Sequence, residues 1–599
     1  MKRVKKFIVP ALVASFVLSS VGSVLAAPHD PQKIKSVDFI GMDAPKTDQE
    51  KNNLMYSKAS VEVTYVDGSK KTLPLSYETL FRPGDVINGK TAGITMNANG
   101  EIMTKADGTP YVSTAPDMNS LMKVPGLQEN TYYMISHYES MPKNENGLEN
   151  PGTMSLSTVK MDPATGRLTV VDIKPIDFSA VHGIWKPCAG LLTPWNTHLG
   201  SEETDPDARA HEANPSKSSV TNYMKNYYND PTMIGNPYYY GHVPEVMVKA
   251  NGDASVVKHY SMGRMAFERV KVMPDNRTVI YGVDSNPGGF FMYVADKAQD
   301  LSAGTLYAAK WIQTSADNEV SANLEWIKLG HASDAEIQQL AETKKFSDIF
   351  DVTDDPIKGK AEGYTPVKTP ANGKKVEWLK MKSGMEKAAV FLETHRYAAY
   401  VGSTVEFNKM EGLDFNEKDN KAYLAISYQE NTMLAEPTAP ADDIQLQKIS
   451  AGGVYELSFQ PNRKTQDGEK IDSHYVPVSM AGLVMGEDMA TPDADGNRAN
   501  VDKIANPDNL VYSPKMRTLF IAEDSDKHEN CYTWAYNVDT KKLSRILSIP
   551  GGGESTGLQM IDNLDGFTYL MNSSQNPGYV GYFAGFPSLD GDIKAKNDK

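Results

Sequence analysis

The sequence predicts an all-β fold, either a sandwich or a propeller. Short runs rich in β-branched and aromatic side chains recur along most of its 599 residues. Turn signals such as Asp275-Asn276, Asn372-Gly373 and Asp565-Gly566 fall between several of these runs, and few segments show helical periodicity. Many short strands with few amphipathic helices are typical of these all-β architectures. The length would allow three or four domains, but a β architecture can use many residues as one unit.

The predicted strands follow one another closely from residue 131 onward. Before that, Ala27 to about Asn130 is mixed, with strand-like pieces such as Val61 to Tyr65 beside Asp-Gly and Asn-Gly turns. The turn Pro163 to Gly166 separates two later runs, as a hairpin requires. The runs that we expect to form strands are Thr131 to Tyr138, Met154 to Lys160, Leu168 to Ile173, Arg277 to Val283, Gly289 to Val294, Thr305 to Ile312, Ala388 to Leu392, Tyr397 to Gly402, Ala422 to Tyr428, Gly453 to Phe459, Asn509 to Tyr512, Thr518 to Ala522, Tyr532 to Val538 and Phe567 to Asn572.

Two stretches interrupt this pattern. Asp205 to Gly241 is polar and rich in Asn and Tyr, which predicts a long loop with a helical piece. Ala332 to Lys345 has apolar positions at helical spacing behind a capping residue, Ser333, and predicts a helical insertion. Asp351 to Lys375, which follows, is interpreted as a linker. No exact repeat is visible, so a propeller would consist of diverged blades.

The amino terminus has the features of a secretory leader. Four basic residues precede or adjoin an apolar run from Phe7 to Leu25, and the small residues Ala26 and Ala27 end it. A basic head, a short apolar middle and a small-residue exit predict a signal peptide over residues 1–26. No other apolar run is long enough to span a bilayer. We therefore expect an exported protein.

Charge and cysteine content exclude several classes. The formal net charge is −15, and loss of the basic leader would make it more negative. Such an acidic chain lacks the clustered Lys and Arg that bind phosphate backbones, so we expect no nucleic-acid binding. Cys188 and Cys531 are too few for a disulfide scaffold, so the fold must rest on its own core. The two thiols could form one bridge in an oxidising compartment, or stay free.

The stretch from Lys186 to Glu203 carries the densest set of chemical groups. It contains the thiol of Cys188, the imidazole of His198 and the adjacent carboxylates of Glu202 and Glu203. Thiolates bind softer metals, whereas carboxylate oxygens suit hard cations such as calcium. The stretch could therefore bind more than one kind of metal. The alternative is a buried cysteine in one strand followed by a solvated acidic pair, since free cysteine is often only a small buried hydrophobe.

Acidic or amide-bearing stretches recur beside strand-like runs that are far apart in the sequence. A propeller brings one loop from each blade to its central channel, so distant carboxylates can converge there. Converging carboxylates repel one another unless they are protonated or share cations, and a metal cluster removes that conflict. The alternative for each stretch alone is a capped turn or an exposed acid. The stretches are Leu199 to Glu203, Gly263 to Glu268, Asn408 to Asp414, Asn506 to Asn509 with Glu523 and Asp524, and Gly551 to Gly557.

These stretches resemble the PhoX-type alkaline phosphatases. The run C-A-G-L-L-T-P-W-N-T-H-L-G-S-E-E from Cys188 is similar to that family's Cys-x-Gly…Thr-Pro-Trp-x-Thr…Glu-Glu signature. G-R-M-A-F-E from Gly263 resembles its Gly-Arg-Phe…His-Glu segment, and P-D-N-L from Pro507 resembles its Pro-Asp-Asn-Leu segment. G-E-S-T-G from Gly553 and Q-N-P-G from Gln575 resemble its closing Glu-x-Thr-Gly and Gln-His-Pro-Gly pieces. Five pieces in the same order, over most of the chain after the leader, are specific for the family.

The resemblance implies a fold and a chemistry. The fold would be a six-bladed β-propeller forming one domain over residues 27–599, with an insertion around residues 330–387. Its channel would hold two ferric ions (Fe3+) and several calcium ions (Ca2+). The implied activity is hydrolysis of phosphate monoesters in the periplasm or outside the cell, in which a metal-bound oxo or hydroxide attacks phosphorus while the cations neutralise the oxyanion charge. We expect small-molecule phosphate esters as the only partners, no membrane contact after leader removal, and a monomer.

The resemblance also implies metal ligands, residue by residue. Cys188 would be the thiolate touching the iron pair, with Glu268 and Glu411 as further iron ligands. The residues that would serve the calcium positions or complete the cluster are Glu202, Glu203, Asp508 and Glu554.

This sequence departs from the family pattern where the phosphate would be held. Lys409 stands where the family has an arginine, and lysine binds phosphate as a point charge without the bidentate fork. Three glycines precede Glu554 where a second basic residue is expected, and Arg545 is the nearest substitute. Phe267 and Asn576 stand where the family has histidine, and its twin-arginine leader is missing. We therefore expect Lys409 and Arg545 to be the catalytic, phosphate-gripping residues.

Two other functions stay open. A calcium-dependent, lactonase-like propeller hydrolase would need carboxylates and amides but neither thiolate nor iron. A non-catalytic metal-binding propeller is the second, because the family's arginines are absent. Asp284-Ser285-Asn286 lacks the twelve-residue calcium-loop pattern and is interpreted as a turn. The sequence contains no Walker loop, no G-x-S-x-G elbow and no H-E-x-x-H.

Overall fold

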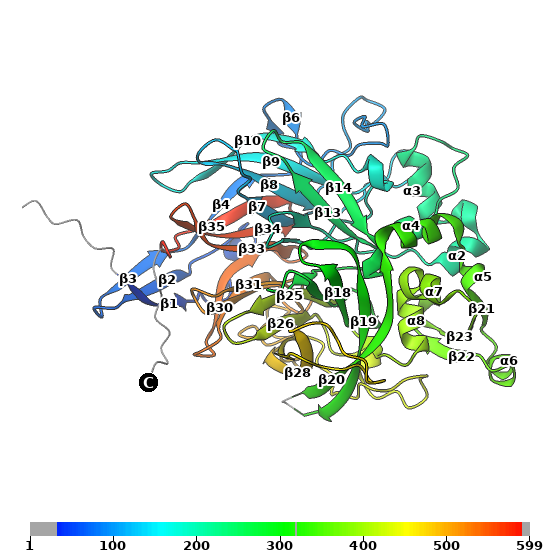
Figure 1. Ribbon diagram of the computed structural model, residues 1–599. Helices are drawn as coiled ribbons and strands as arrows, with labels where there is room; N and C mark the ends of the chain where they lie inside the picture. The colour runs from blue at the N-terminus through cyan, green and yellow to red at the C-terminus, as the bar shows by residue number, and fades with distance from the viewer. Residues whose placement is uncertain (1–32, 318–319, 590–599) are drawn as a thin grey trace, which may run out of the picture.

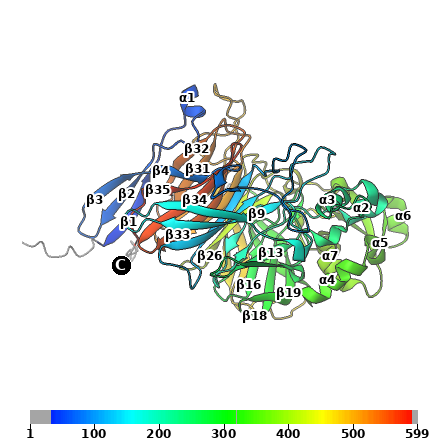
Figure 2. The same ribbon diagram turned by 90° about the horizontal axis from the view of Figure 1, so that it is seen from above.

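The computed structural model describes residues 33–317 and 320–589. Strands make up most of its regular structure, so the expected β-rich fold is confirmed. Figures 1 and 2 show the sheets in the middle of the molecule, with the helices of residues 208–400 on one side and a small sheet of residues 34–74 on the other. No helix within the described ranges is long and apolar enough to cross a membrane. The leader predicted over residues 1–26 lies outside these ranges.

Two four-stranded antiparallel sheets come first along the main body of the chain. In each, neighbouring strands follow one another in sequence, so every connection is a hairpin or a loop back to the adjacent strand. The first sheet consists of β7 (Pro116–Met122), β8 (Thr131–Tyr138), β9 (Thr153–Met161) and β10 (Leu168–Pro175). The second consists of β11 (Leu191–Leu192), β12 (His198–Leu199), β13 (Val243–Val248) and β14 (Ala254–His259).

A nine-stranded sheet follows, and it has two halves. The first half runs in chain order from one edge, and the second half returns in reverse order to the other edge. The long strand β20 pairs with both halves and joins them. Its strands are, in spatial order, β15 (Lys271–Val272), β16 (Thr278–Tyr281), β18 (Phe291–Lys297), β19 (Asp300–Ser315), β20 (Ser321–Ser333), β28 (Val476–Met485), β27 (Gly453–Gln460), β26 (Lys421–Ile426) and β25 (Met410–Asn416).

Two more four-stranded sheets complete the central body. The last of them contains a strand from the beginning of the chain, so the start of the body is hydrogen-bonded to its end. One sheet consists of β29 (Pro507–Ser513), β30 (Thr518–Glu523), β31 (Cys531–Asn537) and β32 (Leu543–Ile549). The other consists of β33 (Glu554–Leu564), β34 (Phe567–Gln575), β35 (Tyr579–Ala584) and β4 (Ser76–Phe81).

The edge strands of these sheets meet one another. The strands β7, β11, β15, β25, β29 and β33 each end a sheet on one side. β7 contacts β11 and β33, β29 contacts β33 and β25, and β25 contacts β15. The amide of Phe267, just before β15, donates to the carbonyl of Glu202 after β12 at 3.0 Å. This bond brings the remaining two sheets together, so the edge strands surround a common centre.

The hydrophobic core lies in layers between neighbouring sheets. Along β8, Tyr132 and Met134 pack towards the last sheet, whereas Tyr133 and Ile135 pack towards the second sheet. Successive side chains of a strand point to opposite faces, and here both faces are covered. Every residue of β8 is therefore buried, including the polar Thr131, Ser136 and His137, and its sequence shows no regular alternation of apolar and polar residues.

Smaller sheets and the helices surround this body. The remaining strands are β1 (Ile34–Ile40), β2 (Ser60–Tyr65), β3 (Lys70–Pro74), β5 (Val86–Ile87), β6 (Lys90–Thr91), β17 (Gly288–Gly289), β21 (Phe350–Thr353), β22 (Thr365–Lys368), β23 (Val376–Met381) and β24 (Val405–Phe407). The α-helices are α1 (Asp48–Lys51), α2 (Ala208–Ala213), α3 (Ser219–Tyr227), α4 (Asp334–Thr343), α5 (Phe346–Ile349), α6 (Pro356–Ala361), α7 (Glu386–Leu392) and α8 (Thr394–Tyr400). Short 3-10 helices occupy Ser179–Val181, Pro215–Lys217, Pro237–Tyr239, Tyr260–Met262, Asn372–Lys374 and Asn431–Met433.

The predicted helix at Ser333 is confirmed, and three nearby predictions are wrong. The side chain of Ser333 caps α4, and Glu336 completes a capping box. The strands expected at Ala388 to Leu392 and Tyr397 to Gly402 are instead helices α7 and α8. Their alanines favour helix, and burial on all sides of α7 removes the helical periodicity that would have shown it. The expected linker at Asp351 to Lys375 forms α6 and two strands of a small sheet.

Candidate metal centre

Acidic and thiol side chains stand where the central edge strands begin. Asp117, Glu411 and Asp508 are each the second residue of their strand, and in all three places the pairing with the next strand is irregular. Such irregularities re-aim side chains and are common beside active sites. The full set at these positions is Asp117 in β7, Cys188 before β11, Glu268 before β15, Glu411 in β25, Asp508 in β29 and Glu554 at the start of β33.

A second set of carboxylates stands where the neighbouring strands end. Because adjacent antiparallel strands run in opposite directions, the end of the second strand lies beside the start of the first. Four of the sheets place an acid at that position. They are Glu139 after β8, Glu203 after β12, Asp284 after β16 and Asp524 after β30.

Three groups of these side chains are close enough to hold metal ions. In each group the ligand atoms lie within 4.8 Å of one another. Cys188 belongs to two groups and so does Glu268, so the groups are linked. The groups are Asp117 with Glu139 and Cys188, Cys188 with Glu203 and Glu268, and Glu268 with Asp284 and Glu411.

The carboxyl groups of the centre repel one another. Burial raises the pKa of Asp117 to about 7 and that of Glu411 to about 8, and neighbouring carboxylates add to both shifts. Burial also raises the pKa of Asp508 and Glu554 well above the ordinary range, and each of these two acids is raised further by other acids of the centre. Without cations, several of these groups must therefore hold protons near neutral pH.

A carboxylate oxygen in this centre lacks a protein partner. The buried Oε2 of Glu268 has no hydrogen-bond donor among the described residues, whereas Oε2 of Glu203 has no hydrogen bond but lies 3.7 Å from Nζ of Lys186. The Cys188 thiol donates to Oδ2 of Asp117 at 2.9 Å, and burial raises the pKa of that thiol. A buried carboxylate without a donor is costly unless a cation meets it. A set of many oxygens with one sulfur fits hard cations, and the sulfur adds a ligand that softer metals prefer.

Two lysines border the acidic groups. Nζ of Lys409 lies 3.1 Å from Oε1 of Glu411 and 3.4 Å from Oδ2 of Asp284. Nζ of Lys186 lies 3.6 Å from Glu139 and 3.7 Å from Glu203. The neighbouring carboxylates raise the pKa of both lysines, Glu411 most for Lys409 and Glu203 most for Lys186. Both ammonium groups stay charged and are partly exposed, so they can bind an anion at the edge of the centre.

Two glycines allow the strands to approach so closely. A Cβ at Gly412 would lie 2.5 Å from the carbonyl oxygen of Asp508, so β25 and β29 can meet only because that side chain is absent. Gly557 has a φ of 69°, and a Cβ there would lie 2.6 Å from the carbonyl oxygen of Asp117. Gly412 follows the predicted ligand Glu411, and Gly557 lies three residues after the predicted ligand Glu554. Both glycines belong to the acidic stretches identified in the sequence.

The match to a family profile decides the identity of the chain. The profile described as alkaline phosphatase PhoX matches residues 152–578. The chain belongs to the PhoX alkaline phosphatase family. It is therefore a phosphatase by family. A comparison with curated protein sequences gave no match.

Solved structures agree at the level of the fold. PhoX of Pseudomonas fluorescens, in complex with vanadate as a transition-state analogue, is 15% identical, with a TM-score of 0.57 over 94% of this chain and 99% of that one. Sqt1 of Chaetomium thermophilum is 7% identical, with a TM-score of 0.27 over 79% of this chain and 96% of that one. The polysaccharide lyase Uly1 is 10% identical, with a TM-score of 0.29 over 84% and 93%. Only the first value is high enough to indicate the same fold.

Most of the residues predicted from the PhoX resemblance lie together. The structure brings to the centre Cys188, Glu203, Glu268, Lys409, Glu411, Asp508 and Glu554. Glu202 does not join them. Its carboxylate accepts from the amides of Trp185, Gly241 and His242 and pairs with buried Lys258 at 2.9 Å. All its lone pairs are thereby engaged away from the centre, so Glu202 holds loops together.

Arg545 is also placed elsewhere. It belongs to β32, at the opposite edge of its sheet from β29. Its guanidinium donates to the carbonyls of Met42 and Val501 and stacks on the rings of Tyr532 and Trp534 at 4.5 and 4.7 Å. A buried cation with these partners cannot reach a phosphate at the centre. The assignment of Arg545 to the phosphate grip is therefore corrected.

Sequence reasoning missed several residues of the centre. Asp117 and Glu139 lie in a segment that contains no recognised motif. Lys186 is the first residue of the cysteine stretch, and the sequence assigns it no role. Asp284 was interpreted as a turn residue, yet it lies with Glu268 and Glu411. The missed acids share one feature that could have identified them. Each stands at the start of a strand of the central sheets or shortly after the end of one.

Both thiols of this PhoX family member are free and buried. Cys188 faces the centre, whereas Cys531 lies in β31, where its sulfur contacts Ser525. No bridge joins them in the structure. The histidine of the Lys186 to Glu203 stretch also lies apart from the centre. The ring of His198 is hydrogen-bonded to His137 and to Ser120.

Proposed function

We propose that this chain is an exported, metal-dependent alkaline phosphatase that hydrolyses phosphate monoesters at the centre described above. The family assignment supports phosphatase activity. The observation that carries the metal requirement is the buried Oε2 of Glu268, which has neither a hydrogen-bond donor nor an ion-pair partner among the described residues and lies within linked groups of acids. Export to the periplasm or the medium rests on the predicted leader. The natural substrates would be small phosphate esters reaching the partly exposed lysines.

The proposed architecture is a six-bladed β-propeller forming one domain over residues 27–599. The support is the set of six edge strands around one centre. The nine-stranded sheet contributes two of them, β15 and β25, so it would count as two blades joined at β20. The pairing of β4 with β35 would close the ring, as blade closure by a distant strand does in propellers. The helices near residues 330–387 would be an insertion at the side of the blades.

The proposed ions are two Fe3+ and several Ca2+. The iron pair would be held by Cys188, Glu268 and Glu411, because iron forms bonds to thiolate whereas calcium takes oxygen ligands, and because these residues occupy linked groups. The oxygen-only positions that remain would suit calcium, and they are Asp117, Glu139, Glu203, Asp284, Asp508 and Glu554. Bound there, the ions would supply Lewis acidity, an activated water and positive charge.

The chain's own residues would bind and orient the ester. The ammonium groups of Lys186 and Lys409 would hold phosphate oxygens and stabilise charge that develops on them. Each lysine now pairs with carboxylates at 3.1–3.7 Å, and cations bound to those carboxylates would free it for the phosphate. Neither lysine forms the bidentate contact of an arginine, so phosphate would be held by charge more than by shape.

The test measures turnover and metal content together. Protein purified from its native compartment should hydrolyse p-nitrophenyl phosphate at alkaline pH and contain iron and calcium by elemental analysis. Cys188→Ser should lose iron and activity, whereas the matched variant Cys531→Ser should keep both. Iron-free protein with full turnover, or a Cys188→Ser variant that behaves as the parent, would contradict the proposal. A calcium lactonase would be insensitive to Cys188→Ser, and a non-catalytic protein would bind metal without turnover.

A further inference from the structure

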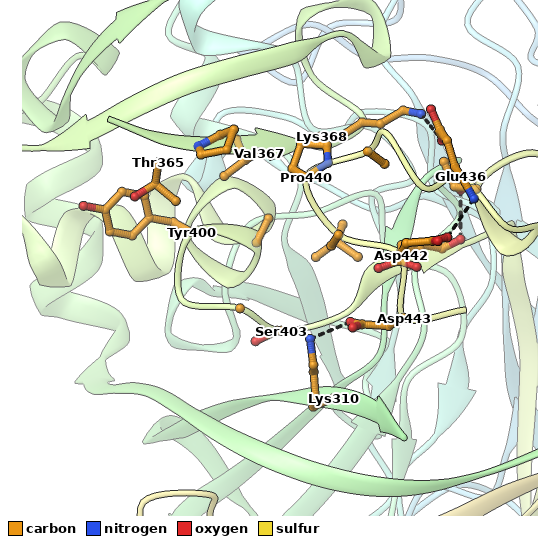
Figure 3. Close-up of a pocket in the computed structure, with 18 residues that line it drawn as sticks. Lys310, Thr365, Val367, Lys368, Tyr400, Ser403, Glu436, Pro440, Asp442 and Asp443 are labelled. Carbon is orange, nitrogen blue, oxygen red and sulfur yellow. Dashed lines mark hydrogen bonds and ion pairs between the residues drawn. The ribbon is translucent and has the colours of Figure 1, made fainter. Parts of the chain in front are cut away.

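A cavity away from the metal centre lies between the helical region and the central sheets. Its volume is about 490 Å³, within the range of small-molecule sites. Figure 3 shows Tyr400 and Thr365 on one side, the pair Lys368–Glu436 on a second side, and Lys310–Asp443 on a third. The cavity therefore has walls from β22, α8, β19 and the loop after the 3-10 helix at residues 431–433.

The charges of this cavity do not balance. Its walls carry four carboxylates and two lysines. Lys310 pairs with Asp443 at 2.7 Å, and Lys368 pairs with Glu436 at 2.5 Å. Asp442 accepts hydrogen bonds from the Glu436 amide and from Gln445, and in the part of the chain that the structure describes no lysine or arginine forms an ion pair with it. The remaining carboxylate is Glu406, and no lysine or arginine is paired with it among the described residues.

Glu406 and Ser403 present free hydrogen-bonding atoms in the lining. Glu406 is 5% exposed, its Oε2 accepts a hydrogen bond from the amide of Ile444 at 2.9 Å, and burial raises its pKa although the backbone of Asp443 and the charge of Lys310 act to lower it. Its Oε1 has no partner among the described residues, and neither has Oγ of Ser403, which is 2% exposed. A buried carboxylate oxygen without a donor is costly, so a ligand that donates a hydrogen bond to Oε1 of Glu406 would offset that cost.

The remaining walls are apolar and aromatic residues together with two threonines, Thr365 and Thr432. Val367, Tyr400 and Pro440 surround the space that the two ion pairs flank (Figure 3). Within residues 33–317 and 320–589, the groups of acids, histidines and cysteines that converge closely enough for a metal ion all belong to the metal centre, and Glu406 is in none of them. The missing donor is therefore better supplied by an organic group than by a bare ion.

We propose that this cavity binds a small organic cation, an ammonium group carried on an apolar body. The ammonium would donate to Oε1 of Glu406 and to Oγ of Ser403, and its charge would offset the acidic excess. The apolar body would pack against Val367 and Pro440, with the ring of Tyr400 able to face the cation. The site uses no residue of the metal centre, so it stands whether or not the phosphatase proposal holds.

The experiment uses 2-phenylethylammonium and its neutral analogue 2-phenylethanol as probes of the metal-loaded, full-length protein. Burial raises the pKa of Glu406 to about 7, so calorimetric titrations are done at about pH 8, where the carboxyl is ionised. The parent should bind the cation at least about tenfold more tightly than the alcohol, as expected for a charge-assisted hydrogen bond. Glu406→Gln should reduce the cation's affinity at least about tenfold and leave the alcohol's unchanged.

Two further variants keep the result interpretable. Glu325→Gln, an exposed carboxylate on β20, should change neither affinity. Ala441→Trp, at an exposed position of the lining loop, should fill the cavity and abolish binding of both probes. Turnover of p-nitrophenyl phosphate should be the same in Glu406→Gln as in the parent. Equal binding of cation and alcohol, no binding by the folded parent, or full cation binding by Glu406→Gln or Ala441→Trp would each overturn the proposal.

Discussion

Removing the cations should make the protein lose stability as the pH rises. Without ions, burial raises the pKa of Glu411 from 4.5 to about 8 and that of Asp117 from 3.8 to about 7. The folded state then binds more protons than the unfolded state between about pH 4 and about pH 8, so the free energy of unfolding falls as the pH rises through that window. In the metal-loaded protein cations take the place of these protons, and the fall should be absent.

The size of the effect follows from the two shifts. At about 1.36 kcal/mol per pKa unit, each shift corresponds to a loss on the order of 4 kcal/mol. The groups influence each other, so the joint loss is smaller than the sum and on the order of 5 kcal/mol. An unfolding entropy of about 2.1 cal/mol/K per residue gives roughly 1.2 kcal/mol per kelvin for this chain. The melting temperature of stripped protein should therefore be about 4 °C lower at pH 8 than at pH 5.

Scanning calorimetry of chelator-stripped and metal-loaded samples across this pH range measures the effect. Stripped Glu411→Gln protein should show a smaller fall, because one of the titrating groups is gone. Glu417→Gln, an exposed carboxylate in the turn after β25, should behave as the parent. Parallel pH profiles for stripped and loaded protein would refute the idea that cations replace protons at this centre.

Three further predictions concern single side chains. Lys409→Ala should lower kcat/KM for p-nitrophenyl phosphate by about 10² to 10³ while Lys409→Arg keeps most of it, and equal activity of all three proteins would exclude Lys409 from the phosphate site. Arg545→Ala should lower the free energy of unfolding by about 2–4 kcal/mol, measured by denaturant titration, with KM unchanged, since its carbonyl and ring contacts are structural. Thiol titration of unfolded, unreduced, metal-stripped protein should find two thiols, and finding none would mean that Cys188 and Cys531 are bridged.

The sequence predicts correctly those strands whose β-branched and aromatic residues suit a strand buried within a sheet. Thr131–Tyr138 and Cys531–Asn537 are rich in β-branched and aromatic residues, and each lies inside a sheet with both faces covered. The same continuous burial prevents the prediction of α7 as a helix. Its buried residues are consecutive, so no polar face reveals the helical period. Local composition therefore predicts an element well only when burial is one-sided or the residue types are unambiguous.

The residues of the candidate metal centre can be predicted from the sequence where they lie in a family motif, but not where they lie outside one. Cys188 and Glu203 lie in a long motif, whereas Asp117 reaches the centre only because β7 contacts β11 and β33. Contacts between strands so distant in sequence are set by the order of the sheets, which residue types do not specify. Glu202 and Glu203 illustrate a finer limit: successive side chains of an extended segment point to opposite sides, so one faces Lys258 and the other faces the centre.

The linked groups explain why the centre would hold a cluster rather than separate ions. Cys188 and Glu268 each belong to two groups of ligand atoms, so ions in neighbouring groups would share an anionic ligand. A shared anion between two cations offsets their repulsion, while the surrounding acids supply the remaining negative charge. Lys186 and Lys409 oppose that negative charge from the protein side, and both are partly exposed. The protein thus contributes excess negative charge to the interior and positive charge to the rim, an arrangement that would attract cations inward and would hold a phosphate ester beside them in the proposed function.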